Sequence, residues 1–299
     1  MKKYIFWVLV YLPLSSIYAQ SGDSKLFFKV FGNYAIPTSG SFRNSDYTTS
    51  IKNHDYSYSS IKDGLGMGLR AGVGIGVVLN DFINLGLDGE KYFGNSIKSN
   101  TLVYEDNNSG SIRITNTNVD YQANILMLSP NITFKALSQT NFFVYNRLSI
   151  KIGINMKVTE KHNIELNERF VEDFNINQNM TDHITNTKQE FEYQGGLPFG
   201  FSTALGFQVK MTDKIRFFAE LEFTQLTYNP KKKVMTRWED YKGKVVDMTT
   251  IDKIMIETEY VDSYTVLDGK TNTKAPLQQP ALRMPFSSIG LGVGFIYKL

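Results

Sequence analysis

Two carboxylates fall on the same side of one predicted strand. Glu220 and Glu222 are separated by a single residue, and side chains two positions apart in a strand point to the same face. A carboxylate pair at this spacing can serve general acid–base catalysis. It can equally be neutralised by cations, for which the chain offers Arg70, Arg147 and Arg216. Neutralisation by charge-assisted hydrogen bonds is the simpler interpretation, and we expect it.

The histidines give little support for catalysis. His54, His162 and His183 all fall in segments that we expect to be long loops, and His54 has an aspartate, Asp55, and serines close by. The chain contains no G-x-S-x-G or H-E-x-x-H motif. His162 and His183 do not stand at a spacing typical of metal ligands. We therefore expect a protein that is not an enzyme and that holds no cofactor and no metal.

A glycine-rich segment, 64–79, indicates where such polar side chains are placed. Its odd positions are all apolar, and its even positions are glycine except at Arg70 and Val78. This period of two predicts a β-strand with one apolar face and one face almost without side chains. A strand facing water would carry polar residues instead, because glycine weakens a strand. The crowded interior of a small closed barrel explains the glycines, and the apolar face then points outward into lipid.

Bulk composition narrows the function classes. The chain has 299 residues, no cysteine and a formal net charge of +3, which is too balanced for a nucleic-acid-binding protein. At its start, Lys2 and Lys3 precede the short apolar run 5–14, and Ala19 ends a plausible cleavage site. These features predict a signal peptide at 1–19 and one domain at 20–299. The apolar run is half of the roughly 20 residues that a spanning helix needs, so membrane insertion must use strands.

Period-two patterning predicts eight strands in the mature chain. In the fourth, the apolar positions change from odd to even beside Pro130, which predicts a β-bulge there. The eight segments are 25–36, 64–79, 82–93, 119–136, 142–156, 196–210, 215–228 and 285–299.

The connections between these strands alternate in length. Short turns such as Asn80-Asp81 and 212–214 follow the even strands, and long segments follow the odd ones at 37–63, 94–118, 157–195 and 229–284. This alternation is typical of outer-membrane barrels, whose short turns are periplasmic. Within the long segments, 101–105 and 111–115 predict a hairpin, 232–240 and 245–251 predict another, and 254–266 predicts further strand. The Lys231-Lys232-Lys233 run is either a solvated loop or a contact for anionic headgroups.

The strand phases place a set of charged side chains inside the barrel. An eight-stranded barrel is just wide enough for side chains to fill it, and a charge buried there must be paired. We expect a salt-bridge network that plugs the lumen, with an ion path as the alternative. The predicted network consists of Lys29, Arg70, Asp88, Glu90, Arg147, Lys151, Arg216, Glu220 and Glu222.

The chain resembles the small bacterial outer-membrane β-barrels of the OmpA and OmpX type. Its last residues, G-V-G-F-I-Y-K-L, are similar to the C-terminal insertion signal of that class, with Gly292, Gly294, Tyr297 and Leu299 at the signal positions. The resemblance implies an all-β, eight-stranded antiparallel up-and-down transmembrane barrel in the bacterial outer membrane. It also implies contact with outer-membrane lipids and with the barrel-assembly machinery during insertion.

By resemblance, the expected function is structural or interaction-based: membrane integrity, adhesion, or an accessory role in an envelope complex. Other envelope proteins or extracellular ligands would bind through the long loops. Three alternatives remain. The first is a narrow porin-like channel for small or apolar solutes, which needs an open lumen or a lateral gap near Pro130. The second is a lipid-modifying outer-membrane enzyme that uses a loop histidine. The third is a soluble exported barrel of the lipocalin kind, with its apolar face inside.

Overall fold

The structure is a computed structural model that describes residues 26–38, 45–50, 55–60, 64–107, 111–136, 141–171, 180–263 and 272–299. The predicted signal peptide at 1–19 and His54 lie outside the described residues.

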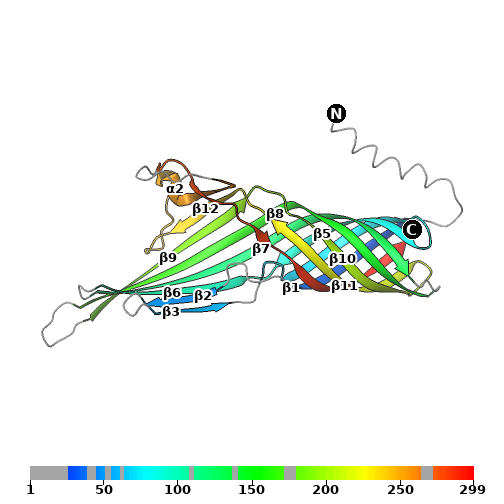
Figure 1. Cartoon of the computed structure of the whole chain (residues 1–299), viewed down its shortest axis with the longest axis horizontal. Coiled ribbons are helices and arrows are strands. Elements are labelled where there is room, and N and C mark those ends of the chain that lie inside the picture. Colours follow the sequence, from blue (N-terminus) through cyan, green and yellow to red (C-terminus); the bar gives the residue numbers. More distant parts are fainter. Residues whose placement is uncertain are drawn as a thin grey trace.

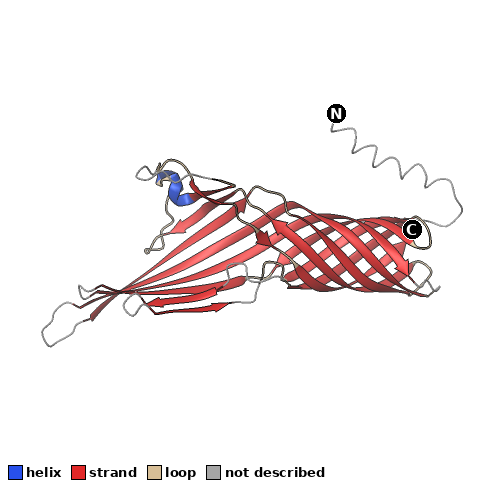
Figure 2. Cartoon of the chain, viewed as in Figure 1, coloured by secondary structure: helices blue, strands red, loops and turns tan. Residues whose placement is uncertain are grey.

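Eight antiparallel strands close into a ring in the part of the chain that is described. β1 (Leu26–Pro37) pairs with both β4 (Gly68–Val78) and β16 (Ser288–Lys298). The ring continues through β5 (Ile83–Gly94), β7 (Ser111–Ala136), β8 (Phe142–Val171), β10 (Phe199–Lys210) and β11 (Ile215–Tyr228), which pairs with β16. A closed ring leaves no unpaired strand edge, which is the condition for a sheet to cross lipid. The predicted up-and-down barrel is confirmed (Figures 1 and 2).

The other elements lie beyond one end of this ring. No helix in the described residues is long and apolar enough to cross a membrane. These elements are β2 (Ser45–Ser50), β3 (Asp55–Ser60), β6 (Ile97–Asn107), β9 (Met180–Gln194), β12 (Lys232–Glu239), η2 (Met248–Thr250), α2 (Lys253–Ile256), β13 (Glu257–Val261), β14 (Leu277–Pro280) and β15 (Met284–Pro285).

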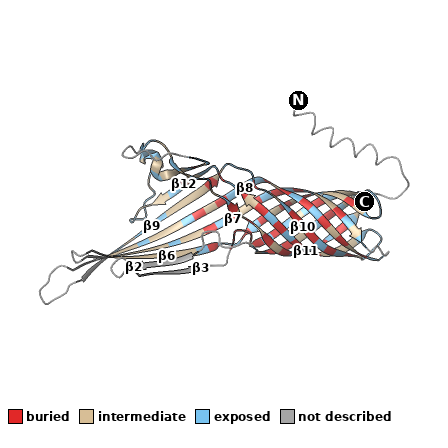
Figure 3. Ribbon diagram, in the orientation of Figure 1, coloured by how far each residue is buried: buried red, intermediate tan, exposed pale blue. Residues whose placement is uncertain are grey.

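Alternation along the ring strands separates the two faces of the barrel. In Figure 3, buried and exposed residues alternate along the strands of the barrel. Large apolar side chains such as Leu205 and Leu291 point outward and are 61% and 71% exposed. Gly292 and Gly294, two of the predicted insertion-signal residues, face inward, whereas Tyr297 and Leu299 are exposed. The apolar exterior contradicts the lipocalin alternative.

The apolar exterior has the layout of a lipid-facing belt. Aliphatic residues occupy its middle, and aromatic residues gather toward both rims, as they do at membrane interfaces. A strand of 11 residues, at about 3.3 Å per residue and tilted by about 40°, spans about 28 Å along the barrel axis. This length is close to the thickness of the hydrocarbon core of a bilayer. Toward the rim with the short turns lie Phe28, Phe82, Phe134, Phe142, Phe207, Phe295 and Tyr297, and toward the other rim lie Tyr34, Phe93, Phe199, Phe201 and Phe223.

The long connections are largely strand. β7 and β8 pair from Ser111↔Phe170 down to Ala136↔Val144, far beyond the predicted 119–136 and 142–156. β6 pairs with β7, so the predicted 101–105 and 111–115 hairpin is confirmed. β9 extends the sheet beside β8, and β12 pairs with β9. We call this sheet, formed by β6, β9, β12 and the parts of β7 and β8 beyond the ring, the platform (Figure 1).

The bulge predicted beside Pro130 is wrong. Pairing has the same register on both sides of Pro130, with Leu128↔Ile152 and Asn131↔Ser149. The register shifts instead between Leu126 and Met127, where β8 carries one extra residue at Ile154. The apolar odd residues of β7 therefore keep a single phase and point into the barrel, where they form part of an internal cluster. Pro130 pairs with Leu87 of β5, and β7 pairs with β8 on both sides of it.

The second predicted hairpin forms only next to its turn, where Glu239 and Val245 form an antiparallel bridge and Val246 N donates to Trp238 O. β12 pairs with β9 and with β13, while Val245 forms only one bridge, to Glu239, and 248–250 forms a 3₁₀ turn. Of the predicted strand 254–266, the structure forms β13 after the short α2, and 264–266 lie outside the described residues. The sequence pattern missed the non-local pairing because strand alternation carries no information about the partner.

Candidate functional site

Charged side chains from five strands meet at the centre of the lumen. Lys29 Nζ lies 2.6 Å from Asp88 Oδ2, and Arg147 Nη1 lies 3.2 Å from the same oxygen. Arg147 also pairs with Glu220 and lies 3.8 Å from Glu222. Asp88 and Arg147 thus connect β1, β5, β8 and β11 across the interior.

The network extends toward the platform end. Lys151 pairs with Glu90 and lies 3.1 Å from Glu222. Arg70 lies 3.7 Å from Glu222 and donates hydrogen bonds to Thr224 and Ser288 at 2.8 and 2.7 Å. Arg70 therefore brings β4 and β16 into contact with the shared carboxylate.

Among the described residues, the network is electrically neutral. Four cations (Lys29, Arg70, Arg147, Lys151) meet four carboxylates (Asp88, Glu90, Glu220, Glu222), and all eight are buried. The structure thus brings together eight of the nine residues that the sequence placed in the lumen. Pairing is required because an isolated buried charge costs several kcal/mol.

Arg216 is the exception. It is only half-buried and lies at the short-turn end of β11, where its guanidinium carbon is 5.2 Å from the ring centroid of Phe143. The prediction that it joins the lumen network is wrong. Its side chain points inward as expected, but it stands four residues before Glu220, too far along the strand to reach the carboxylates.

The glycine face makes room for this network. A Cβ on Gly74 would lie 2.1 Å from Asp88 Oδ1, and one on Gly290 would lie 2.3 Å from Asn33 Oδ1. Asn33 in turn donates to Glu222 at 3.3 Å. Glycine in β4 and β16 is therefore a steric requirement of the polar side chains on neighbouring strands.

An apolar layer closes the lumen toward the short turns. Phe143, Tyr145, Phe218 and Ile296 pack together, with Phe27 and Phe31 against them. Tyr145 connects this layer to the network, because its hydroxyl donates to Glu220 Oε2 at 2.7 Å. The cavity between the layer and the network measures about 20 Å³, which is room for about one water molecule.

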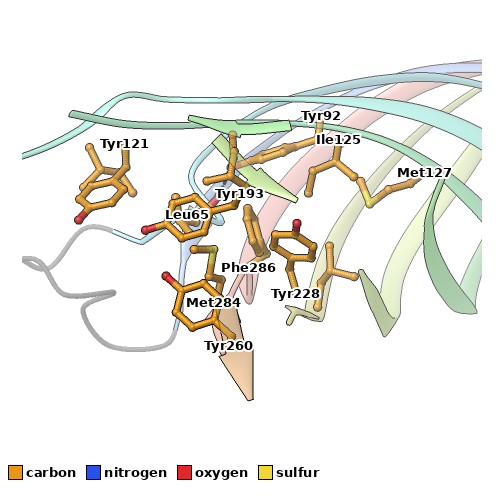
Figure 4. Packing of buried hydrophobic residues seen from close by; sticks show 14 residues of the cluster. Leu65, Tyr92, Tyr121, Ile125, Met127, Tyr193, Tyr228, Tyr260, Met284 and Phe286 are labelled. Carbon is orange, nitrogen blue, oxygen red and sulfur yellow. Dashed lines mark hydrogen bonds between the residues drawn. The ribbon is translucent and has the colours of Figure 1, made fainter. Parts of the chain in front are cut away.

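A second apolar layer fills the end of the barrel beneath the platform (Figure 4). Met127, Ile125 and Tyr92 contribute from the barrel wall, and Leu65 and Phe286 enter from the connecting segments. The Tyr92 hydroxyl donates to the carbonyl oxygens of Leu65 and Met67, which fixes the segment before β4 in the opening. The Phe286 ring meets the Tyr92 ring edge-on at 6.3 Å. The described lumen is thus occupied at three successive levels.

The platform contains a buried carboxylate that the sequence reasoning missed. Glu160 on β8 contacts His162 Nε2 at 2.5 Å and Lys233 Nζ at 2.7 Å, and it accepts hydrogen bonds from the hydroxyls of Tyr193 and Tyr121 at 2.5 and 3.3 Å. These contacts hold β7, β8, β9 and β12 together. The extra residue at Ile154 moves the inward face of β8 from odd to even positions and so turns Glu160 inward. The sequence pattern does not reveal this bulge.

Charge compensation sets the pKa of this carboxylate. Burial alone raises the pKa of Glu160, but the hydrogen bond from His162 and the charge of Lys233 outweigh burial and hold the pKa at about 2. Burial and the charge of Glu160 raise the pKa of Tyr193 well above its ordinary value. Glu160 is therefore an anion that anchors Lys233, and Lys233 also lies 4.1 Å from the Phe191 ring centroid.

These contacts bear on the predictions for the Lys231–Lys233 run and for the histidines. Lys233 is not part of a solvated loop run, although Lys231 and Lys232 are exposed. His162 is held by Glu160, whereas the side chain of His183 lies outside the described residues. Among the described residues, no group of three His, Cys, Asp or Glu side chains could hold a metal ion.

No family model matches the chain, and no curated protein matches it. Among solved structures, the chain is similar to Neisserial surface protein A, with 10% identity, a TM-score of 0.34, and coverage of 93% of this chain and 100% of that one. It is also similar to a deltaS2 mutant of the TodX monoaromatic hydrocarbon channel, with 8% identity, a TM-score of 0.15, and coverage of 93% and 91%. The third similar structure is OmpT, an outer membrane protein of Vibrio cholerae. The identity is 10%, the TM-score is 0.08, and the alignment covers 93% of this chain and 99% of that one.

The strand ring, the apolar belt and the filled interior define the class of protein independently of these similarities. A closed antiparallel barrel with an apolar exterior, a polar interior, short turns at one end and long segments at the other is the architecture of outer-membrane barrels. The chain is a small transmembrane β-barrel of this type.

The network predicts that replacing a buried arginine costs much more folding stability than replacing an exposed one. Arg147→Leu leaves Asp88 and Glu220 without their shared cation, so we expect a loss of about 3–5 kcal/mol in the free energy of unfolding. The matched control is Arg113→Leu, because Arg113 pairs with Glu168 at 2.5 Å while half exposed, and a cost below about 1 kcal/mol is expected. Urea unfolding in lipid vesicles measures both. Equal costs would show that the lumen charges are solvated.

Glu160 predicts an acid-sensitive platform. Because the folded pKa of about 2 lies below the ordinary value of 4.5, its stabilising contribution is complete above pH 4.5 and is lost as the pH falls from about 4.5 to 2. When residues 1–19 are removed, Trp238 on β12 is the one tryptophan that remains. Its fluorescence therefore reports the packing of β12. We expect a fluorescence change in that pH range, and Glu160→Gln should remove it. A variant with the wild-type pH profile would exclude Glu160 as the anchor.

Proposed function

We propose that the protein is a closed anchor in the bacterial outer membrane that presents the platform to a protein partner outside the cell. In this proposal, residues 1–19 direct export and are removed, and the barrel-assembly machinery inserts the chain. The barrel holds the platform at the membrane surface and conducts nothing. The proposal assigns the protein no catalytic role.

The observation that carries the proposal is the combination of a blocked lumen with strands that continue past the membrane. Both apolar layers and the neutral network occupy the interior, and the space between the Phe143 layer and the network holds only about one water. From Ile154 to the end of β8 at Val171, 18 residues extend the wall by about 59 Å of strand at about 3.3 Å per residue. A barrel that served only as a membrane plug would have no use for such an extension.

The platform is suited to a protein partner because one of its strands has a free edge. β9 pairs with β8 along its whole length, but within the described residues it pairs with β12 only from Lys188 to Gln194. The backbone groups of 181–187 on the other side are thus available for pairing with an added strand. Ile184 in this stretch is 58% exposed.

Cysteine labelling tests the placement, because the chain contains no cysteine of its own. Ile184→Cys should react with a membrane-impermeant maleimide on intact cells. Met211→Cys lies in the short turn between β10 and β11 and is similarly exposed, so it should react only after the envelope is opened. Labelling of position 211 on intact cells, with 184 protected, would reverse the orientation and overturn the proposal.

A further inference from the structure

A groove of about 400 Å³ crosses the outward face of the platform, which is the face that continues the lipid-facing exterior of the barrel. The groove runs across β6, β7, β8 and β9, between two rows of polar side chains. Four residues between the rows point to the opposite face, because side chains alternate along a strand, so their backbone forms the floor. These residues are Ser99, Val119, His162 and Gln189.

The row of side chains nearer the membrane alternates in charge. Lys98 lies in register with Asp120, Asp120 with Lys161, and Lys161 with Glu190. Lys161 Nζ lies 3.5 Å from Glu190 Oε1, and Ser96 Oγ donates to Asp120 Oδ1 at 2.5 Å. Within the described chain, Asp120 Oδ2 accepts no hydrogen bond and Lys98 makes no ion pair. The row is therefore neutral in sum, yet it presents both an unused acceptor and an unused donor.

The second row consists of amides and one lysine. Asn118 lies in register with Asn163, and Asn163 with Lys188. Asn118 Oδ1 accepts a hydrogen bond from Asn100 at 2.9 Å, and Asn163 Oδ1 accepts none among the described residues. Lys188 Nζ lies 3.8 Å from Glu239 Oε2, so its charge is also compensated. This row offers hydrogen-bonding groups without a net charge.

The composition of the groove selects among ligand classes. No large apolar or aromatic side chain of its lining residues points into it, although such side chains dominate the core of a protein interface. Its balanced charges give no field that would attract a polyanion. Alternating donors and acceptors match hydroxyl groups, because each hydroxyl both donates and accepts. The floor crosses four strands and is about 14 Å long, which suits a chain of sugar rings.

We propose that this groove binds an uncharged, hydroxyl-rich oligosaccharide of the bacterium's own surface glycolipid. Position favours this source. Asn124 of β7 lies in register with Phe93 of the aromatic rim on the platform side, and Asp120 follows four residues further out, about 10 Å above that rim. At that height the groove opens sideways into the layer where glycolipid sugars stand. This assignment rests on the proposed function, which places the platform outside the cell.

The test uses the mature chain in phosphatidylcholine vesicles, titrated in a calorimeter. The probe is the oligosaccharide that mild acid releases from the surface glycolipid of the bacterium that makes the protein. We expect binding that is lost when the probe is first treated with periodate, because periodate cleaves the vicinal diols that would meet the two rows. We also expect binding to change little with salt, because both rows are neutral.

Two variants of β7 locate the binding site. Asp120→Ala removes a carboxylate that lines the groove, and we expect an affinity about 10-fold lower because a hydrogen bond to a charged group is lost. Gln122→Ala is the matched control, because Gln122 is exposed on the same strand but does not line the groove. Its affinity should equal that of the wild type. Both variants should keep the shifted migration of a folded barrel in an unheated gel, which separates loss of the site from loss of folding.

Absence of binding by the wild type, equal binding of the periodate-treated probe, or equal losses in the two variants would overturn the proposal. Equal affinity for dextran, an uncharged polysaccharide foreign to the membrane, would overturn the assignment to the surface glycolipid. These titrations do not depend on the orientation of the barrel in a cell. The glycan proposal can therefore fail while cysteine labelling at 184 and 211 supports the proposed function, and labelling can fail while the titrations succeed.

Discussion

Charge neutrality inside a narrow lumen is the constraint on which this structure depends. An eight-stranded barrel has an interior only as wide as the side chains that fill it. Charges in that space cannot be hydrated and must be paired. The protein satisfies this condition with four cations and four carboxylates of the described chain, arranged so that Glu222 lies within 4 Å of Arg70, Arg147 and Lys151.

The steric layout of the barrel follows from this constraint. Large polar side chains on β5, β8 and β11 need space, and the inward glycines of β4 and β16 supply it. Apolar layers above and below shield the network from water, and Tyr145 joins the lower layer to Glu220. A filled, cross-linked interior makes the barrel rigid, which suits a base for β7 and β8 to extend into the platform. At that level a second compensated carboxylate, Glu160, fixes β12 to β8 and β9.

Sequence patterning predicted the barrel well because its signals are local. Alternation in 196–210 and 215–228 reports directly which side chains face lipid, and β10 and β11 follow these segments closely. The lumen network followed from the same phase. The predictions that failed concern features that depend on distant pairing. The apolar odd residues from Val119 to Met127 looked like one half of a change of phase, yet they belong to the apolar layer that fills the barrel interior beneath the platform.

Two further failures have the same origin. In the sequence, Lys233 is one of three consecutive lysines and nothing distinguishes it from the other two. Its contact with Glu160 depends on the pairing of β12 with β9. Arg216 has the inward phase of the network residues but the wrong height in the barrel, and height depends on strand tilt and register. Alternation gives the face of a residue, whereas its neighbours across the lumen require the closed ring.

The central claim is that the lumen is filled and closed, and planar-bilayer recording of the purified protein tests it most directly. The account predicts no steady single-channel openings from the wild type. Phe286→Ala should behave in the same way, because removing one ring from the upper layer leaves the network and the lower layer in place. Steady unitary conductance from the wild-type protein would contradict the account.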